Sequence, residues 1–495
     1  MANPLKRLAG ETAIYGLSTI LVRVINFTFI PIYTRVLSRA EYGIASELLA
    51  YIAILQVILT MGLETGCFRF ANKYPNSKQV FSTALSTVGI ACAVFFTACL
   101  LFSGDIASLM GREGFGMCIV YLGAILATDC FTSILFAKLR YERKAIKFVT
   151  FKTIKILTEL GCNLLLFFAL PAYFVSHTNS WLLYFVSPTP DFTYILFAIF
   201  ISCLIAFVLM IPDILRTRFV YNKSVWQALM KYSLPLMIAG LPGIANDFID
   251  RILFRFCMPK NIIWEEQLGD FQANIKLAVL MTLFIQMFRY AAEPFFFGEE
   301  KNKSAPQLYA NVMNHFVAFC MCIFLFITFY IDAIGLIIGK DFRAGVAIVP
   351  IMLGAYVLLG INFNLSMWYK LSGKTQFAVY ITSSGLLLTV IINIVFMPYY
   401  GYHAAAWGHL FSYLLMAILS AILGAKYYPI PYNWVRILSY IAIGAALFLV
   451  NRLIPFPNLW VKWIVNTALL VAYAMYWMRT EKVNILDLLH SAVRK

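Results

Sequence analysis

The chain has 495 residues, of which 62% are hydrophobic and only 13% are charged, and its mean hydropathy is +0.80. This balance excludes a soluble enzyme or a soluble binding domain, because such a chain cannot present enough polar surface to water. The formal net charge is +16. In a hydrophobic chain, basic clusters set the orientation in the membrane or touch anionic lipid, so we expect no nucleic-acid partner.

Apolar stretches long enough to cross a lipid bilayer recur along the whole sequence. A bilayer core of about 30 Å needs about 20 apolar residues per helix. The sequence therefore predicts an all-α polytopic membrane protein with about fourteen transmembrane helices. In chain order, the predicted spans are residues 12–34, 44–66, 80–103, 115–138, 146–170, 192–212, 232–256, 270–292, 308–330, 345–369, 376–397, 402–424, 434–452 and 459–478.

The distribution of lysine and arginine predicts the orientation of these spans. Cytoplasmic segments of membrane proteins hold an excess of both residues. The strongest basic cluster, between residues 138 and 147, and the segment 171–191, which has no lysine or arginine, would lie on opposite sides of the membrane. This asymmetry places both termini in the cytoplasm.

The two halves of the chain open in similar ways. Each begins with a span that contains an arginine, continues through a polar external hairpin and enters a glycine-led helix, at Tyr42-Gly43 in one half and Leu268-Gly269 in the other. Six spans separate the openings, so the halves would share one orientation and be related by a pseudo-two-fold axis along the membrane normal. Such parallel repeats are a transporter architecture. We expect two six-helix lobes, residues 1–225 and 226–425, followed by two extra helices and a cytoplasmic tail in 426–495.

Charged side chains gather in the predicted seventh span. Asp247, Arg251 and Arg255 are four residues apart and share one helical face, with Asp250 beside them. A central charge costs about 2.5–3.5 kcal/mol even on the lower insertion scales, so it usually faces a water-filled cavity or a partner. The preceding Pro242-Gly243 pair permits a kink or hinge. A purely structural kink and a kink beside a working cavity stay open as alternatives.

Other spans carry polar residues at similar depth. Arg23 lies halfway along the first span, and Asn26 follows almost one turn later. In the fifth span, Lys155 and Glu159 can pair with each other, but we expect them to line a cavity. Lys276 in the eighth span is the counterpart of Arg23 in the second half.

Four acids are candidates for coupling transport to an ion. Asp129 is alone in the fourth span, where it can carry a proton, bind a cation or accept a hydrogen bond from a neighbouring helix. Glu159, Asp247 and Asp250 are the other candidates. The sequence does not distinguish sodium from proton coupling. The five histidines are scattered and no metal-ligand spacing is present, so we expect no metal and no cofactor.

The deep basic residues outnumber the deep acids by one, which favours an anionic substrate such as a phosphate or diphosphate. The candidate substrate-binding residues are Arg23, Asn26, Lys155, Arg251, Arg255 and Lys276. The sequence has no phosphate-binding glycine loop, no HExxH segment and no nucleophile elbow. We therefore expect a transporter that is not an enzyme and is not driven by its own ATP hydrolysis.

Four segments in a fixed order resemble a known family. They are Arg35-Val-Leu-Ser-Arg-Ala-Glu-Tyr42-Gly43, Leu234-Pro235-Leu with Asp250-Arg251, Tyr369-Lys-Leu-Ser-Gly-Lys374-Thr375, and Pro398-Tyr-Tyr-Gly401-Tyr-His403-Ala404. Over nearly its whole length the chain resembles the polysaccharide transporters, the O-antigen and capsule flippases, of the multidrug/oligosaccharidyl-lipid/polysaccharide flippase superfamily. His403 departs from the pattern, which usually has glycine there, and so inherits no role.

The resemblance implies a function. Such proteins move undecaprenyl-diphosphate-linked oligosaccharides from the cytoplasmic to the outer leaflet of the bacterial inner membrane by alternating access, with the glycan in a central, often cationic cavity. Arg23 matches by position the arginines that related peptidoglycan-precursor flippases use, and Arg255 and Lys276 match more loosely. The implied partners are the lipid-linked glycan, the bilayer and a polysaccharide polymerase or export machinery.

Two other functions compete with this interpretation. A drug or organic-cation antiporter of the same superfamily would have about twelve spans and an acidic, aromatic cavity, so the last two helices and Arg23 argue against it. A membrane-embedded glycan polymerase would crowd polar residues into an external loop. The external loops of this sequence are short and poor in charged residues.

Overall fold

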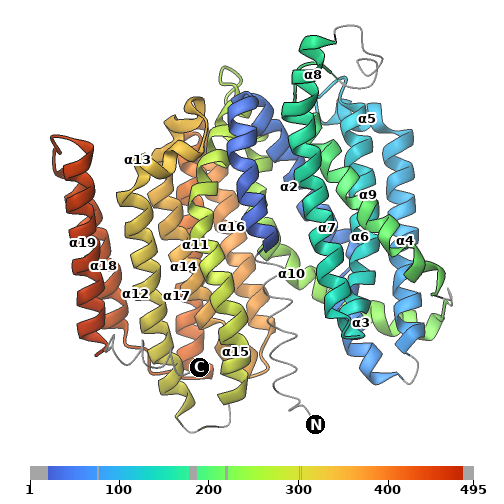
Figure 1. The fold of residues 1–495 in the computed structure, drawn as a ribbon. Helices are drawn as coiled ribbons and strands as arrows, with labels where there is room; N and C mark the ends of the chain where they lie inside the picture. Colours follow the sequence, from blue (N-terminus) through green and yellow to red (C-terminus); the bar gives the residue numbers. More distant parts are fainter. Residues whose placement is uncertain are drawn as a thin grey trace. The chain divides into compact units, whose positions relative to one another are not determined.

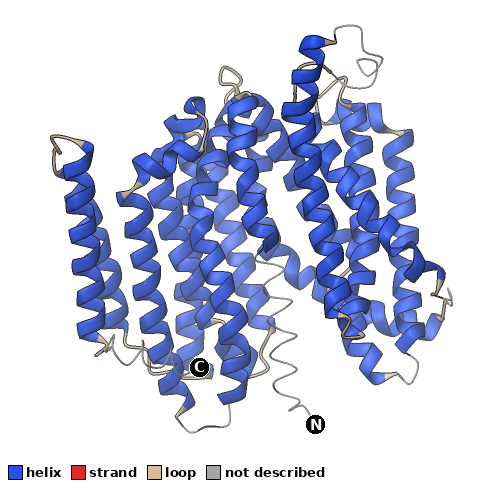
Figure 2. Cartoon of the chain, in the orientation of Figure 1, coloured by secondary structure: helices blue, strands red, loops and turns tan. Residues whose placement is uncertain are grey.

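The computed structural model describes residues 21–74, 77–177, 187–217, 221–299, 302 and 304–482. Within these residues the chain forms helices and loops and no strand (Figure 2). It divides into two compact units, Met1–Gln272 and Ala273–Lys495 (Figure 1).

The first unit is built from long apolar helices. In it, α6 packs against α4 and α9, α7 packs against α9, and α10 packs against α2 and α3. In chain order its helices are residues 21–36, α2 (Arg39–Thr60), α3 (Leu63–Lys73), α4 (Ser77–Leu101), α5 (Ser103–Leu109), α6 (Gly116–Tyr141), α7 (Ala145–Leu164), the π-helical η1 (Leu165–Ala169), α8 (Leu170–Ser176), α9 (Thr193–Leu215), α10 (Lys223–Cys257) and the start of α11 (Trp264–Glu299).

The second unit contains the rest of α11 and all later helices. There α17 packs against α14 and α16, and α12 packs against α14 and α18. The helices are α12 (Ala305–Phe329), α13 (Ile331–Ile334), the 3-10 segments η3 (Gly335–Ile337) and η4 (Lys340–Ile348), α14 (Val349–Leu365), α15 (Met367–Leu371), α16 (Gln376–Tyr400), α17 (Tyr402–Tyr427), α18 (Trp434–Leu453) and α19 (Leu459–Thr480).

The predicted all-α polytopic membrane fold is confirmed. Among the described residues, thirteen helical segments are long and apolar enough to cross a membrane. They coincide with the predicted spans from the second to the fourteenth. The predicted first span, 12–34, lies partly outside the described residues, and its described part belongs to the helix over 21–36. The predicted lobe boundary near residue 225 stays a prediction.

The predicted second span is divided into two helices. A capping box of Ser38 and Glu41 starts α2, and Met61 ends it in the left-handed conformation with φ of 51°. Gly62 follows with φ of 65°, and a Cβ atom there would lie 2.7 Å from the carbonyl oxygen of Ser233. The break therefore requires glycine for both its backbone conformation and the close approach of α10.

Two glycines allow α2 and the start of α11 to cross in close contact. A Cβ atom at Gly43 would lie 2.0 Å from the carbonyl oxygen of Glu265, and one at Gly269 would lie 2.0 Å from the carbonyl oxygen of Arg39. Arg39 is four residues before Gly43, and Glu265 is four residues before Gly269, so each helix offers the same pair of groups to the other. The two glycine-led openings that are similar in sequence therefore meet reciprocally in the structure, as small residues permit between membrane helices.

We expect Gly43→Ala to destabilise the protein. The added methyl group would clash with backbone that cannot rotate away, and such overpacking costs about 1–3 kcal/mol. The thermal melting temperature of the detergent-solubilised protein should fall. Gly240→Ala is the control, because a Cβ atom there meets nothing within 4 Å and alanine favours the helix. Equal melting of Gly43→Ala and the wild type would contradict the tight crossing.

Candidate functional site

An ion pair joins three helices inside the first unit. The Lys155 ammonium on α7 donates a hydrogen bond to Oδ1 of Asp129 on α6, and Nε2 of Gln56 on α2 donates to the other carboxylate oxygen at 2.8 Å. The side chains of Lys155 and Asp129 are only 17% and 25% exposed. Each charge therefore depends on the other, because an isolated ion in this environment would be strongly destabilised.

This pairing shows the contacts that Asp129 and Lys155 make in the structure. Asp129 accepts hydrogen bonds from two neighbouring helices, which is one of the three roles considered for it. The charged partner of Lys155 is Asp129 on another helix, although Glu159 lies one turn away on its own helix. Proton or cation coupling through these acids stays a prediction.

A buried acceptor lies further along α7. Asn163 is completely buried, and its Nδ2 donates to the carbonyl oxygen of Glu159 at 2.8 Å. Its Oδ1 atom has no hydrogen-bond partner among the described residues. The π-helical turn Leu165–Ala169 follows at once, and such turns are frequent at functional sites. The side chain of Tyr33, on the helix over 21–36, also contacts the Asn163 side chain, so a tyrosine hydroxyl lies beside this acceptor.

Helix 21–36 reaches η1, which directly continues α7. The rings of Tyr33 and Phe167 have centroids 5.5 Å apart, and Figure 1 shows the two helices running in the same direction. At 1.5 Å per residue, Arg23 lies about 15 Å before Tyr33, and Lys155 lies about 18 Å before Phe167. Arg23 and Lys155 are therefore at similar depth in their helices. Arg23 is half-buried and Asn26 is exposed.

A second charged cluster surrounds Glu47 on α2, whose side chain is completely buried. Arg112, in the connection between α5 and α6, donates to its Oε2 through Nε at 3.3 Å and through a terminal nitrogen at 2.8 Å. A terminal nitrogen of Arg255 on α10 lies 3.6 Å from Oε1, and the Tyr51 hydroxyl donates to the same oxygen at 3.3 Å. The cluster gives a buried carboxylate two guanidinium partners.

The same network continues to the start of α11. Arg112 also lies 3.7 Å from Glu265, and Arg39 pairs with Glu266 at 2.6 Å and with Asp270 at 3.2 Å. These ion pairs flank the crossing at Gly43 and Gly269. Together they tie α2, α10 and the start of α11 into one charged assembly.

Sequence reasoning placed Arg255 in the substrate site but missed Glu47 and Arg112. Glu47 was detectable, because it is an acid four residues after Gly43 inside a predicted span. Arg112 was not detectable, because nothing in the sequence indicates that an arginine in a predicted external loop is buried. The structure places Arg255 next to Glu47, and its role toward a substrate stays a prediction.

The remaining charges of the predicted seventh span lie on α10. Asp250 is completely buried, whereas Asp247 is exposed. The Arg251 guanidinium lies over the Phe248 ring, 4.4 Å from its centroid. The helix is continuous through Pro242 and Gly243, and a Cβ atom at Gly243 would meet nothing within 4 Å. A hinge at this pair stays a prediction.

Of the predicted site residues, the described contacts bring Asp129 and Lys155 directly together. Lys276 belongs to the second unit, where it is half-buried on α11. The geometry thus supplies a mostly buried ion pair of Lys155 and Asp129, and the binding of an anion there stays a prediction.

Comparison with known proteins shows the family to which this chain belongs. A family model described as "Polysaccharide biosynthesis protein" matches residues 8–298. No curated protein matches the sequence significantly.

Solved structures have the same fold. The lipid II flippase MurJ in an inward closed conformation has a TM-score of 0.72 at 11% identity, over 94% of this chain and 99% of that one. An inward-facing multidrug resistance MATE family transporter of the MOP superfamily has a TM-score of 0.60 at 12% identity, over 86% and 99%. A MOP superfamily transporter from Pyrococcus furiosus has a TM-score of 0.54 at 12% identity, over 88% and 95%.

Proposed function

Because this chain belongs to the polysaccharide biosynthesis protein family and shares the fold of the lipid II flippase and of MATE transporters, we propose that it is a lipid-linked oligosaccharide flippase of the MOP superfamily. It moves an undecaprenyl-diphosphate-linked repeat unit from the cytoplasmic to the outer leaflet of the bacterial inner membrane, with both of its termini in the cytoplasm. The family match over residues 8–298 carries this proposal. The fold shared with the lipid II flippase supports it.

The polar residues inside the helices supply the proposed substrate site. Arginine and lysine are suited to a diphosphate because they combine positive charge with several hydrogen-bond donors. In the first unit, the diphosphate and the first sugars bind to Arg23, Asn26, Lys155, Arg251 and Arg255, while Pro242 and Gly243 flex. Lys276, in the second unit, is a further candidate for binding the substrate. A polymerase or export machinery receives the translocated unit.

The pair of Lys155 and Asp129 suggests how an ion could be coupled to transport. While Asp129 is a carboxylate, it holds Lys155. Protonation of Asp129, or binding of a cation to it, would release the ammonium for an anionic substrate. Glu159, Asp247 and Asp250 are the other candidates for the ion-carrying residue.

Deleting the gene in its host tests the proposed function. We expect loss of surface polysaccharide and recovery when the wild-type gene is supplied from a plasmid. Normal surface polysaccharide with a new sensitivity to cationic drugs would instead indicate the drug-antiporter function, to which the fold of the MATE transporters also corresponds.

A further inference from the structure

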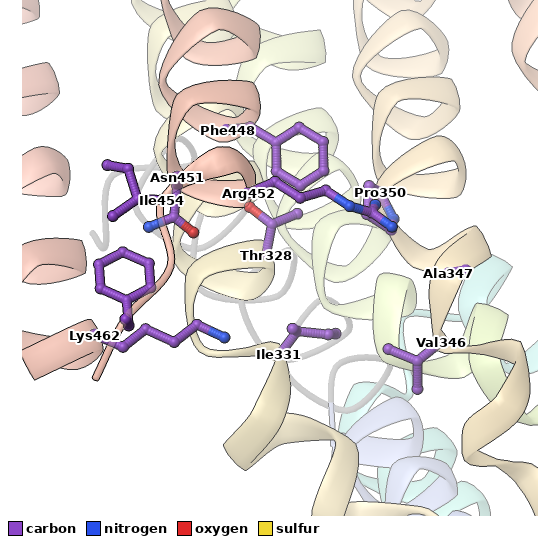
Figure 3. A pocket seen from close by; sticks show the side chains of 11 residues that line it. Thr328, Ile331, Val346, Ala347, Pro350, Phe448, Asn451, Arg452, Ile454 and Lys462 are labelled. Atoms are coloured by element: carbon purple, nitrogen blue, oxygen red, sulfur yellow. The ribbon is translucent and has the colours of Figure 1, made fainter. Parts of the chain in front are cut away.

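A cavity of about 350 Å³ lies at one end of the second unit. It is formed where α12 ends and α14 begins, beside the loop that joins α18 to α19 (Figure 3). Its volume is within the range of small-molecule sites. None of its lining residues is among those proposed for transport.

The position of the cavity corresponds to the headgroup level of a bilayer. It lies at helix ends, since α18 ends at Leu453 and α19 begins at Leu459. Tryptophan and tyrosine, which favour membrane interfaces, are close by. Trp460 is 72% exposed, and the Trp463 ring lies 5.5 Å from that of Trp460 and 6.4 Å from that of Tyr330.

Two basic side chains enter the cavity. Arg452 extends across it towards Pro350, and Lys462 extends in the direction of Ile331 (Figure 3). Lys462 is paired with Asp332. Among the residues that the structure describes, Arg452 has no hydrogen-bond or ion-pair partner. Its planar guanidinium is therefore available for two parallel hydrogen bonds to a phosphate.

The walls of the cavity are held in place by buried asparagines. Asn451, next to Arg452, donates a hydrogen bond to the side chain of Asn466 on α19. Asn466 in turn donates to the carbonyl oxygen of Phe329 at the end of α12, at 2.6 Å. These bonds join α18, α19 and α12 directly beside Arg452, so the cavity is formed before a ligand arrives.

An apolar surface leads away from the basic groups. Phe448 and Ile454 line the cavity itself. On the same face of α18 as Arg452, one turn earlier, Leu449 is 56% exposed, and the neighbouring Leu453 is 81% exposed. A ligand with a phosphate at one end and hydrocarbon at the other would satisfy both surfaces.

We propose that this cavity binds the phosphodiester headgroup of an anionic glycerophospholipid. Arg452 donates two hydrogen bonds to the phosphate, Lys462, whose charge is shared with Asp332, lies beside it, and the acyl chains lie along the exposed leucines of α18. Basic pockets between transmembrane helices hold lipid headgroups on the cytoplasmic side of membranes, and with both termini in the cytoplasm this cavity would be a counterpart that serves the outer leaflet.

Native mass spectrometry of the purified full-length protein tests this site. Wild type, Arg452→Gln and Arg452→Lys are titrated with phosphatidylglycerol and with zwitterionic phosphatidylcholine. We expect one phosphatidylglycerol to bind in preference to phosphatidylcholine, with the Kd raised about fivefold or more in Arg452→Gln and less in Arg452→Lys. Lys340→Gln is the matched control, because Lys340 is exposed on η4 and does not line the cavity.

Several results would overturn the assignment. Equal binding of phosphatidylglycerol by wild type and Arg452→Gln would remove Arg452 from the site. If Lys340→Gln raised the Kd for phosphatidylglycerol as much as Arg452→Gln does, the binding would reflect diffuse attraction to basic residues. Arg452-dependent binding of inorganic phosphate or of a polyprenyl phosphate, without phosphatidylglycerol binding, would assign the cavity to another ligand.

Discussion

Asp129→Asn should lower the thermal stability of the protein strongly. The change removes the negative charge that holds Lys155 while leaving the ammonium in a mostly buried place. Breaking one side of a buried ion pair costs about 3–5 kcal/mol when the remaining charge is uncompensated, and Glu159, one turn along α7, offsets part of that cost here. The melting temperature of the detergent-solubilised protein and the amount recovered from membranes should both fall. Lys155→Met should behave similarly.

The double variant Asp129→Asn/Lys155→Met distinguishes this pairing from two independent defects. It removes both charges, so its stability should exceed the value obtained by adding the two single effects. Glu64→Gln is the matched control, because the 3.4 Å pair of Arg140 and Glu64 also joins α6 to a neighbouring helix but is exposed on both sides, at 40% and 38%. We expect the control substitution to lower the free energy of unfolding by at most about 1 kcal/mol. If the two single substitutions lowered the stability by amounts that simply add in the double variant, the pairing would be contradicted.

Arg23→Ala should abolish export of surface polysaccharide without changing the amount of protein in the membrane. The proposed site uses this guanidinium, half-buried in the helix over 21–36, to bind the diphosphate of the substrate. Arg23→Lys keeps the charge but loses the planar pair of donors, so it should export at an intermediate level. Complementation of a deletion strain, with surface polysaccharide and membrane protein level measured together, checks both expectations.

A nearby variant controls for damage to the helix. Thr28→Ala changes an exposed side chain of the same helix, whose hydroxyl donates only to the carbonyl oxygen of Ile25 at 2.7 Å. It should export normally. Full export by Arg23→Ala at normal protein level would remove Arg23 from the site, while the deletion phenotype would still report on the function of the chain.

Hydropathy was sufficient to predict the membrane helices because each span must be apolar over about twenty residues whatever its neighbours are. It could not locate interruptions within a span. The break at Met61 and Gly62 depends on two left-handed residues and on α10, and the π-helical turn at Leu165–Ala169 leaves no mark in composition. These features arise from contacts between helices, and the mean hydropathy of a sequence window contains no information about such contacts.

The candidate site was predictable as a set of deep charges but not as a set of pairs. Spacing along one helix can suggest Lys155 with Glu159, yet the chosen partner, Asp129, comes from α6. Such a pairing depends on how each helix is rotated about its axis, which side-chain spacing alone does not determine. Glu47 and Arg112 illustrate the same limit, since their pairing joins a span to a loop.

The sidedness of the lipid-linked oligosaccharide in the inner membrane of the deletion strain tests the proposed transport most directly. Inverted and right-side-out membrane vesicles are compared for labelling of the glycan by an impermeant reagent. We expect full-length repeat units to be trapped on the cytoplasmic face and to return to the outer face when the wild-type gene is restored. Full-length units on the outer face without this protein would contradict its role as the flippase.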